Sequence, residues 1–336
     1  MINTVEDAIG QIRHIQLDSE HSPEQILHMI LAGGVSQSLF NVATGGHQPA
    51  LQFLCRETRK ISHYPVSGGI IKDDEKGRPY FSRGVKDFPA NEHQNEFLGM
   101  LAASGIFFGT PVTTEQGREF TLADLADVAM KTHSDSVEEP GWSLMLFSLH
   151  PGVTSEWTNE RGEIWNVERI LRAACKLPFG AGSCFGTHVI EGIAFAVSRY
   201  CLERACKPNQ LEGVWLEAHD YVAHAANLMG KNQKDDGSIP RCWFKEKKYP
   251  RTLKEWRESL LDIVSRRFRR ARAIVYPTGH CLDALSPLSM FLVPAHPWIH
   301  AACYITADTI QSQWLRIGNQ LCAVTHAVHA LKLLGT

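Results

Sequence analysis

The sequence predicts an all-α protein, and three observations carry that prediction. Apolar residues recur at three- and four-residue spacing through most of the chain, which is the period of an amphipathic or buried helix. Glycine- and proline-rich breaks separate these runs at intervals of roughly 30 to 45 residues, which suits a helix, a turn and a second helix. Some predicted helices are rich in small residues and others carry long charged faces, so we expect inner helices around a central cavity and outer helices around those. The expected architecture is an (α/α)6-like toroid or barrel.

The helical period is clear in seven segments. Thr121 stands before one of them with Asp124 three residues later, which is the pattern of a capping box at a helix start. The stretch TNERGE near residue 160 likewise offers N-cap side chains followed by acidic residues. Alternation typical of strands is scarce, and its best candidate is an irregular hairpin over 68–84. The predicted helices cover residues 123–133, 167–177, 187–206, 214–232, 253–275, 298–314 and 321–334.

The length of 336 residues exceeds the size at which a single core usually stops growing, so one large domain and two smaller ones are both compatible with it. The helical rhythm favours one toroid domain over 1–336. Within it, we expect residues 1–90 to form a helical N-terminal portion that includes the hairpin, and residues 90–334 to form the repeat-bearing core.

Charge and cysteine content argue against several classes of protein. The net charge of -2 gives no electrostatic footprint for nucleic acid, so we expect no such partner and interpret the basic run 266–272 as a solvated helix face. Nine irregularly spaced cysteines are typical of reduced thiols in a cytoplasmic protein rather than of a disulfide scaffold. No signal-peptide pattern and no run of about 18 apolar residues is present, so we expect no membrane span. Phosphate-loop, dinucleotide-fold and serine-hydrolase motifs are absent too.

One stretch resembles a known family. Residues 227–244, NLMGKNQKDDGSIPRCWF, resemble the glutamine-tryptophan repeat of terpenoid cyclases and protein prenyltransferases, with Gln233, Asp235, Gly237 and Trp243 at the corresponding points. The departure is IPRC between Ser238 and the tryptophan. Those families share an α/α toroid with a central cavity. The chain also resembles a group of α/α-toroid proteins from planctomycete bacteria, which implies the fold and no reaction. This second resemblance rests on residues 92–102, 157–171, 183–197, 232–238, 277–285 and 325–334.

Two similar stretches suggest a metal site. In GSCFGTHVIEG, Cys184 and His188 would lie at i and i+4 on one face of a helix. In YPTGHCLDAL, His280 stands at the analogous place, while the adjacent Cys281 would point about 100° away. A thiolate and neutral imidazoles are good zinc ligands, so Cys184, His188 and His280 are the predicted ligands and zinc is the candidate cofactor. Lanthipeptide cyclases and protein farnesyltransferases are toroids that hold zinc with such ligands, but their spacing is not reproduced here. The alternative is a buried thiol with two histidines bonded to loop carbonyls.

Histidines and acids supply the candidate acid–base groups. Histidine titrates near neutrality and serves as acid, base or ligand, and in a toroid the inner helices converge. The alternative for any one of them is a packed core histidine. The D-x-D-D acid of terpenoid cyclases and the D-D-x-x-D magnesium motif are both absent. The histidines at starts or inner faces of apolar helices are His93, His188, His280, His326 and His329, and the acids near them are Glu92, Glu96, Glu191, Asp220 and Asp283. Of these, His188, His280, His93, His329 and Glu96 are the predicted catalytic residues.

These elements predict an enzyme of the lyase or cyclase type that works in the central cavity and uses histidines as acid, base or metal ligands. The tryptophans of the apolar helices suit a small-molecule substrate that is apolar or sugar-like. The alternative is a non-catalytic module whose cavity or concave face binds a lipid or a protein partner. A catalytic histidine has a perturbed pKa and faces a pocket, whereas a packing histidine is sealed, so the two hypotheses differ in the surroundings of the same side chains.

Overall fold

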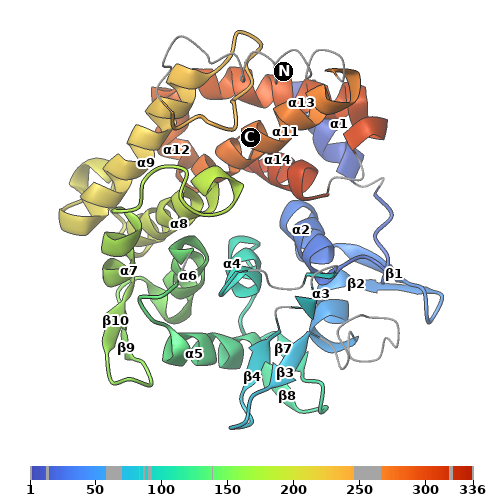
Figure 1. Cartoon of the computed structure of the whole chain (residues 1–336), viewed down its shortest axis with the longest axis vertical. Coiled ribbons are helices and arrows are strands. Elements are labelled where there is room, and N and C mark those ends of the chain that lie inside the picture. Colours follow the sequence, from blue (N-terminus) through green and yellow to red (C-terminus); the bar gives the residue numbers. More distant parts are fainter. Residues whose placement is uncertain are drawn as a thin grey trace, which may run out of the picture. The chain divides into compact units, whose positions relative to one another are not determined.

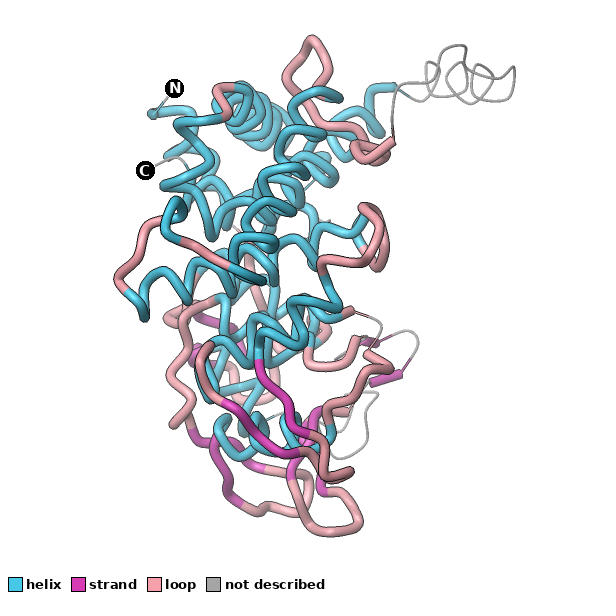
Figure 2. Tube along the Cα trace, turned by 90° about the vertical axis from the view of Figure 1, so that its left-hand side faces the viewer, coloured by secondary structure: helices cyan, strands magenta, loops and turns pink. Residues whose placement is uncertain are grey.

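The computed structural model describes residues 2–12, 15–57, 70–82, 84–85, 88–89, 93–137, 139–245, 266–317 and 321–334. Helices make up most of this part of the chain, and strands occur there as short hairpins (Figure 2). The all-α class is therefore confirmed in its coarse form, while the toroid arrangement stays a prediction. The described residues cluster into two compact units, each assembled from separate stretches. Unit 1 comprises Met1–Ile15, Pro178–Thr187 and Val222–Thr336, and unit 2 comprises Gln16–Leu177 and His188–Tyr221.

Unit 2 contains the same structural motif twice, a hairpin followed by an amphipathic helix and then a more buried one. The first copy consists of β7 (Pro111–Thr113), β8 (Glu119–Thr121), α5 (Leu122–Thr132) and α6 (Pro140–Phe147). The second consists of β9 (Glu156–Thr158), β10 (Ile164–Asn166), α7 (Val167–Ala174) and α8 (Thr187–Arg204), of which the first residue, Thr187, belongs to unit 1. The two copies give the predicted rhythm of helices a structural basis within this unit.

The two amphipathic helices match position by position. Both begin at a side-chain cap, because Thr121 forms a capping box with Asp124 and the side chain of Asn166 accepts a hydrogen bond from the N–H of Arg169. Both bury residues at i, i+3, i+4 and i+7, the spacing of one helix face. These residues are Leu122, Leu125, Ala126 and Ala129 in α5, and Val167, Ile170, Leu171 and Ala174 in α7.

A five-residue turn recurs four times in the described chain. In each case the first residue donates its N–H to the carbonyl of the fifth, and the glycine at the fourth position donates its N–H to the carbonyl of the first. The glycines have φ between 75° and 86°, a left-handed conformation that favours glycine. The turns are 74–78, 114–118 and 159–163 in unit 2, and 234–238 in unit 1. The third of them is the TNERGE stretch, so its interpretation as a helix start is wrong and Asn166 is the actual cap.

The predicted hairpin over 68–84 is confirmed for its described part. In it β3 (Ile71–Asp73) pairs antiparallel with β4 (Pro79–Phe81), and residues 68, 69 and 83 lie outside the described residues. The same part of unit 2 holds further short elements, some of which sequence periodicity did not indicate. They are α2 (Pro23–Gly33), β1 (Ser38–Asn41), β2 (Gly46–Pro49), α3 (Ala50–Gln52), a π-turn over Phe53–Glu57, β5 (Gly84–Val85), β6 (Phe88–Pro89) and α4 (Glu96–Ala103).

The core of unit 2 is built from closely packed helices. Helix α4 lies beside α2 and α6, and every residue of α6 is buried (Figure 1). A Cβ added at Gly99 of α4 would lie 2.8 Å from the carbonyl oxygen of Trp142 in α6. Gly141 of α6 and Gly192 of α8 meet in the same way, with backbone against backbone. The small residues therefore let these helices approach closely, as the composition of α8 suggested.

Unit 1 is a helical cluster. Helix α11 (Arg266–Leu285) packs against both α13 (Trp298–Ile317) and α14 (Leu321–Leu334), and α13 also packs against α1 (Ile2–Gln11), as Figure 1 shows in orange, red and blue. A short turn at Ser286–Leu288 leads into α12 (Ser289–Ala295). The last part of α9 (Gly213–Asn232), from Val222 on, belongs to this unit as well.

The stretch that carries the family resemblance forms a compact turn in unit 1. The side-chain amide of Gln233 donates hydrogen bonds to the carbonyls of Gly237 and Trp298, at 2.8 and 3.1 Å, and Trp243 is fully buried. The basic run 266–272 opens α11. Of the predicted helix 253–275, residues 253–265 lie outside the described residues.

Candidate metal and acid–base site

The candidate site lies where α11 and α14 of unit 1 pack against each other. A Cβ added at Gly279 of α11 would stand only 2.7 Å from the Cβ of Ala327 in α14, so this close contact depends on the missing side chain. Polar side chains with metal-binding or acid–base chemistry flank the contact on both helices. They are His280 and Asp283 on α11, and Cys322, His326 and His329 on α14.

Asp283 is the centre of this group. Its side chain is fully buried, and its two oxygens accept hydrogen bonds at 2.6 Å, Oδ2 from Nδ1 of His326 and Oδ1 from Nδ1 of His329. The hydroxyl of Ser286 donates a longer one to Oδ1, at 3.5 Å. Burial by itself raises the pKa of the Asp283 carboxyl. The charge of His329 and the hydrogen bonds from both histidines outweigh burial and hold that pKa well below its ordinary value. Asp283 is therefore an ionised carboxylate at neutral pH.

This carboxylate determines the orientation of both rings. An ionised carboxylate only accepts hydrogen bonds, so Nδ1 of His326 and Nδ1 of His329 each carry a proton. In the neutral tautomer the lone pair is then on Nε2, which is the nitrogen that binds a metal or accepts a proton. The surroundings of the two rings differ, because the His326 side chain is 2% exposed and that of His329 is 12% exposed.

His280 is oriented by its own helix. Its Nδ1 donates to the backbone carbonyl of Tyr276 at 2.7 Å, so Nε2 again carries the lone pair. That Nε2 lies 3.6 Å from Sγ of Cys322. The His280 ring also lies against the His326 ring, with centroids 4.2 Å apart. His280 is therefore oriented like His326: its Nδ1 donates to an acceptor, and its Nε2 carries the lone pair.

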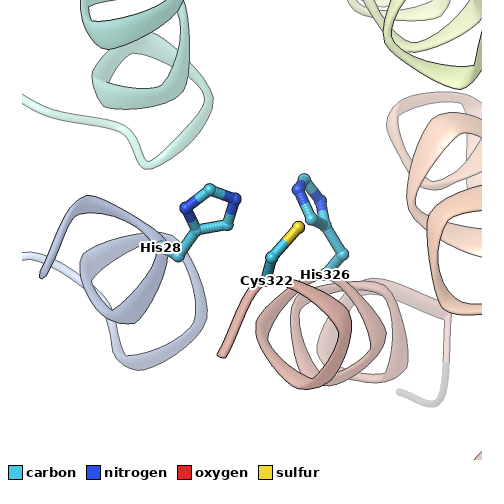
Figure 3. A group of neighbouring side chains, drawn as sticks. All are labelled: His28, Cys322 and His326. Carbon is cyan, nitrogen blue, oxygen red and sulfur yellow. The ribbon is translucent and has the colours of Figure 1, made fainter. Parts of the chain in front are cut away.

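Cys322 and His326 form a pair on one helix. They are four residues apart on α14, and Figure 3 shows both side chains projecting from the same side of it; His28, which is also labelled there, belongs to α2 in unit 2. The sulfur and a ring nitrogen of His326 lie within 4.8 Å of each other. The pattern C-x3-H therefore does place a thiol and an imidazole together, in the stretch CAVTH.

The predicted helical pair at 184 and 188 is wrong in its local structure. Cys184 lies in a short 3-10 turn over Cys184–Gly186, and Cys184 and Phe185 both have positive φ, 45° and 64°. Helix α8 begins only at Thr187, whose hydroxyl donates to the carbonyl of Cys184. The physical reason is the glycine content of GAGSCFG: at Gly186 an added Cβ would lie 2.8 Å from the backbone of Gly180. A turn this tight does not continue a helix.

Cys184 nevertheless lies near His280. Both belong to unit 1, and a ligand atom of each lies within 4.8 Å of the other. The Cys184 sulfur is also 3.4 Å from the hydroxyl of Tyr276. Burial first, and then the neighbouring thiols of Cys184 and Cys322, raise the pKa of Tyr276, so its hydroxyl stays protonated and available as a donor. Two of the three predicted metal ligands, Cys184 and His280, are therefore neighbours in one unit.

The spacing of these groups suits a tetrahedral metal. Zinc binds sulfur at about 2.3 Å and imidazole nitrogen at about 2.0–2.1 Å, which at a tetrahedral angle separates the two ligand atoms by about 3.6 Å. Nε2 of His280 and Sγ of Cys322 lie 3.6 Å apart. The acceptors behind the two rings, the Tyr276 carbonyl and the Asp283 carboxylate, are the partners that metal-bound histidines usually have. The separation of His280 and Cys322 thus matches that of two ligands of one tetrahedral metal ion.

The other predicted catalytic residues belong to unit 2, where two of them, His93 and His188, lie near a buried glutamate. Nδ1 of His188 and Nδ1 of His93 lie 3.8 and 3.7 Å from Oε2 of Glu139, which also accepts a hydrogen bond from the indole N–H of Trp142 at 3.1 Å. Glu96 accepts the backbone N–H of His93 at 3.0 Å in the first turn of α4. The predicted set is thus divided: His280 and His329 lie in unit 1, and His188, His93 and Glu96 lie in unit 2.

The remaining acids have varied surroundings. Glu191 is buried on α8 in unit 2, and Asp220 is an exposed residue of α9 in the same unit. Glu92 lies outside the described residues. Sequence reasoning did not select Cys322 or Tyr276 at all, although CAVTH repeats the spacing of CFGTH and Tyr276 stands four residues before His280, one turn away on α11.

Unit 2 contains a separate pocket of about 290 Å³. Its lining includes the aromatic rings of Tyr80, Phe81 and Phe97, with Asn95 and Thr132 as polar groups. The rings of Phe81 and Phe97 stack with centroids 3.9 Å apart. The predicted catalytic residues are not among those that line this pocket.

Comparison with known proteins does not assign the chain to a family. The chain matches no protein-family model, no curated protein and no solved structure. The resemblance to toroid enzymes therefore stays a prediction from the sequence. Among the helices of the described residues, none is long and apolar enough to cross a membrane.

Proposed function

We propose that this protein is an enzyme with a zinc centre in unit 1, and that His280, Cys322 and His326 are the three protein ligands. The observation that carries the proposal is the 3.6 Å separation of His280 Nε2 from Cys322 Sγ, the distance expected between two ligands of one tetrahedral zinc. The hydrogen bonds behind the rings support it, because in both histidines Nδ1 donates to an acceptor and the lone pair is on Nε2.

Three protein ligands leave a fourth position for water or substrate, which is the pattern of catalytic rather than structural zinc sites. Zinc bound there would act as a Lewis acid and lower the pKa of a bound water. Cys184, a ligand in the sequence prediction, lies beside His280 with its thiol next to the Tyr276 hydroxyl. His188, the third member of that prediction, follows Thr187 directly in the chain and remains a sequence prediction.

The residues around the ligands provide the acid–base chemistry. Asp283 keeps His329 in the tautomer with a lone pair on Nε2, and the His329 ring is the more exposed of the two that Asp283 binds. His329 therefore acts as the general base that takes a proton from the substrate. Proton removal beside a Lewis acid suits a lyase or cyclase, with an apolar or sugar-like substrate. The central cavity of a toroid, where this would occur, is part of the same proposal.

Metal analysis of the purified full-length chain tests the proposal. We expect close to one zinc per chain by inductively coupled plasma mass spectrometry, and loss of most of it in Cys322→Ser, His280→Gln and His326→Gln. Cys175→Ser serves as a control, because Cys175 is a half-buried cysteine like Cys322 but belongs to unit 2. A zinc-free wild type that also fails to bind added zinc would refute the metal centre.

Cobalt substitution tests whether the site is open. Cobalt(II) bound by a thiolate shows a sulfur-to-metal charge-transfer band, which Cys322→Ser should abolish. In an open three-ligand site Cys184→Ser leaves both the band and the metal content unchanged. If Cys184→Ser halves the band and weakens zinc binding, the site is closed by four protein ligands, and the catalytic role is wrong.

The pocket of unit 2 favours a second candidate function, the binding of a small ligand without catalysis. Its stacked aromatic rings suit an apolar or sugar-like molecule. Thermal-shift screening of such compounds tests this, with Ala129→Trp as the comparison because Ala129 lines the pocket and a larger side chain would fill it. Ligands that stabilise the wild type and Ala129→Trp equally would argue against the pocket.

A further inference from the structure

The end of helix α8 in unit 2 brings two cysteines together. The N–H of Cys206 donates to the carbonyl of Cys201 at 3.0 Å, and the N–H of Ala205 donates to the carbonyl of Leu202 at 3.3 Å. With Ala205 in the left-handed conformation at φ 49°, these two bonds form a Schellman motif in which Cys201 is C3 and Cys206 is C″. A contact between the side chains at C3 and C″ frequently accompanies this motif.

The two sulfurs interact as the motif predicts. Burial first, and then the neighbouring Cys206 thiol, raise the pKa of Cys201 to about 11. Cys201 is 5% exposed, whereas Cys206 is half-buried and thus the more exposed residue of the two. The more exposed cysteine thus lies at C″ and the buried one at C3 of the same motif, which is the arrangement of an attacking and a resolving cysteine.

We infer that Cys201 and Cys206 form a reversible disulfide when the protein meets a low-molecular-weight disulfide of the glutathione type. The Cys206 thiolate attacks one sulfur of that compound, forms a mixed disulfide and releases the first small thiol. The Cys201 thiolate then attacks the Cys206 sulfur and releases the second. Two protein thiols are oxidised, one small disulfide is reduced to two thiols, and the two protons pass from the protein thiols to the released thiolates.

The pair is distinct from the proposed zinc centre. Both cysteines lie in unit 2, and neither is among the proposed ligands. Cys242, in unit 1, provides a contrast within the same chain: its side chain is exposed, and no interaction with another thiol is recorded for it among the described residues. Under the same treatment Cys242 should stop at the mixed disulfide, whereas Cys206 should pass on to the linked form.

The sequence allows an unambiguous assay. Trypsin cleaves after Arg199 and Arg204, and the Lys207–Pro208 bond resists it, so Cys201 and Cys206 end up in separate peptides, 200–204 and 205–231, with one cysteine each. The full-length chain is incubated with oxidised glutathione, the remaining thiols are alkylated, and the digest is measured by mass spectrometry. We expect peptide 200–204 linked to peptide 205–231 as the main form of both, with full release by dithiothreitol.

Two variants separate the steps. In Cys201→Ser, Cys206 should accumulate as the mixed glutathione disulfide, because the resolving thiol is gone. In Cys206→Ser, Cys201 should escape oxidation, because its burial keeps glutathione away from it. It should therefore be found in the digest in the alkylated form. The wild-type digest decides the question even if a variant does not fold. A wild type in which Cys206 carries glutathione while Cys201 is still alkylated overturns the inference, and so does a link from Cys206 to any other cysteine.

Discussion

Asp283 shows how one buried charge can orient a whole site. A fully buried carboxylate costs several kcal/mol unless hydrogen bonds compensate, and here two histidine Nδ1 atoms donate to it at 2.6 Å. The oxygens of the side chain are thus used to fix two rings on the same helix, His326 and His329. Asp283 therefore orients both the proposed metal ligand, His326, and the proposed base, His329.

Replacement of this carboxylate should be costly. In Asp283→Asn an amide N–H₂ would face a ring N–H, so one hydrogen bond is lost and a buried donor is left unsatisfied. We expect the free energy of unfolding to fall by about 2–4 kcal/mol in urea denaturation at pH 7. A variant as stable as the wild type would show that the charge does not hold the rings.

Asp283 also predicts a pH dependence. Its pKa is lowered in the folded chain, so the unfolded chain binds the proton first as pH falls, and the stabilisation is complete above the unfolded pKa of about 3.9. Below that pH the wild type should lose stability progressively, and Asp283→Asn should lose less. Urea midpoints measured between pH 6 and pH 3 test this, and parallel curves for the two proteins would contradict it.

His133 in unit 2 is a histidine of the packing kind. Its ring packs edge-on against Trp165 and Phe147, with centroids 4.5 and 5.2 Å away, and burial lowers its pKa to about 4 against the opposing charge of Asp135. It is therefore neutral in the folded chain. The sealed surroundings are those expected for a structural histidine rather than a catalytic one.

The lowered pKa of His133 predicts a pH dependence of the free energy of unfolding. The unfolded chain takes up this proton near pH 6.5 and the folded chain only near pH 4, so stability falls as pH decreases between these values, by about 3 kcal/mol in total. His133→Phe keeps the ring packing and should remove most of this slope. Chemical denaturation at pH 7, 6, 5 and 4 measures it, and an unchanged slope in the variant would assign the loss to other groups.

At the scale of elements, the contact of α11 with α14 decides whether the site exists. Gly279→Ala should destabilise the protein by about 1–3 kcal/mol, because the added methyl would overlap Ala327, although alanine favours a helix over glycine by about 1 kcal/mol. It should also weaken zinc binding, because the helices that carry the ligands move apart.

Gly10→Ala provides the matched control for that prediction. Gly10 is also a helical glycine of unit 1, in α1, but nothing lies within 4 Å of a Cβ added there, so the change should leave stability equal or slightly higher. Thermal unfolding of both variants gives the comparison. Equal effects of the two substitutions would mean that helix propensity, not the helix contact, governs position 279.

The helices were predictable from the sequence because their apolar period extends over many turns. The predicted segments 214–232, 298–314 and 321–334 correspond to α9, α13 and α14 almost residue by residue. The hairpins β7–β8 and β9–β10 were missed because three-residue strands are too short for alternation to appear. Their signal was the turn glycine instead, at 117 and 162, where φ is positive.

The candidate site was predictable only in part. His280, Asp283 and His329 stood out as polar residues in apolar helices. The i, i+4 argument was applied to Cys184 and His188, where positive φ at Cys184 and Phe185 prevents a helix, and not to Cys322 and His326, where the helix is continuous. Spacing predicts a shared face only when the intervening backbone is helical, and GAGSCFG contains the glycines that argue against that.

At the scale of the whole molecule, bound zinc should contribute to stability. A ligand that binds only the folded chain stabilises it by about 2.7 kcal/mol at a concentration of 100 times its dissociation constant. A chelator should therefore lower the melting temperature by a few degrees, and added zinc should restore it whereas magnesium should not, because thiolate and imidazole ligands suit zinc. His280→Gln should be insensitive to the chelator, and equal sensitivity of variant and wild type would contradict the proposed ligand set.

The path of the chain has a practical consequence for anyone who wishes to dissect this protein. Because unit 1 is assembled from three stretches and unit 2 from two, no single contiguous fragment of the gene encodes either one. A truncation from either end that reaches into residues 16–221 removes part of both units, and a shorter one still removes part of unit 1, so deletion analysis would report misfolding rather than the role of a part. Point substitutions, or a rearranged gene that joins the stretches of one unit with new linkers, are the appropriate tools.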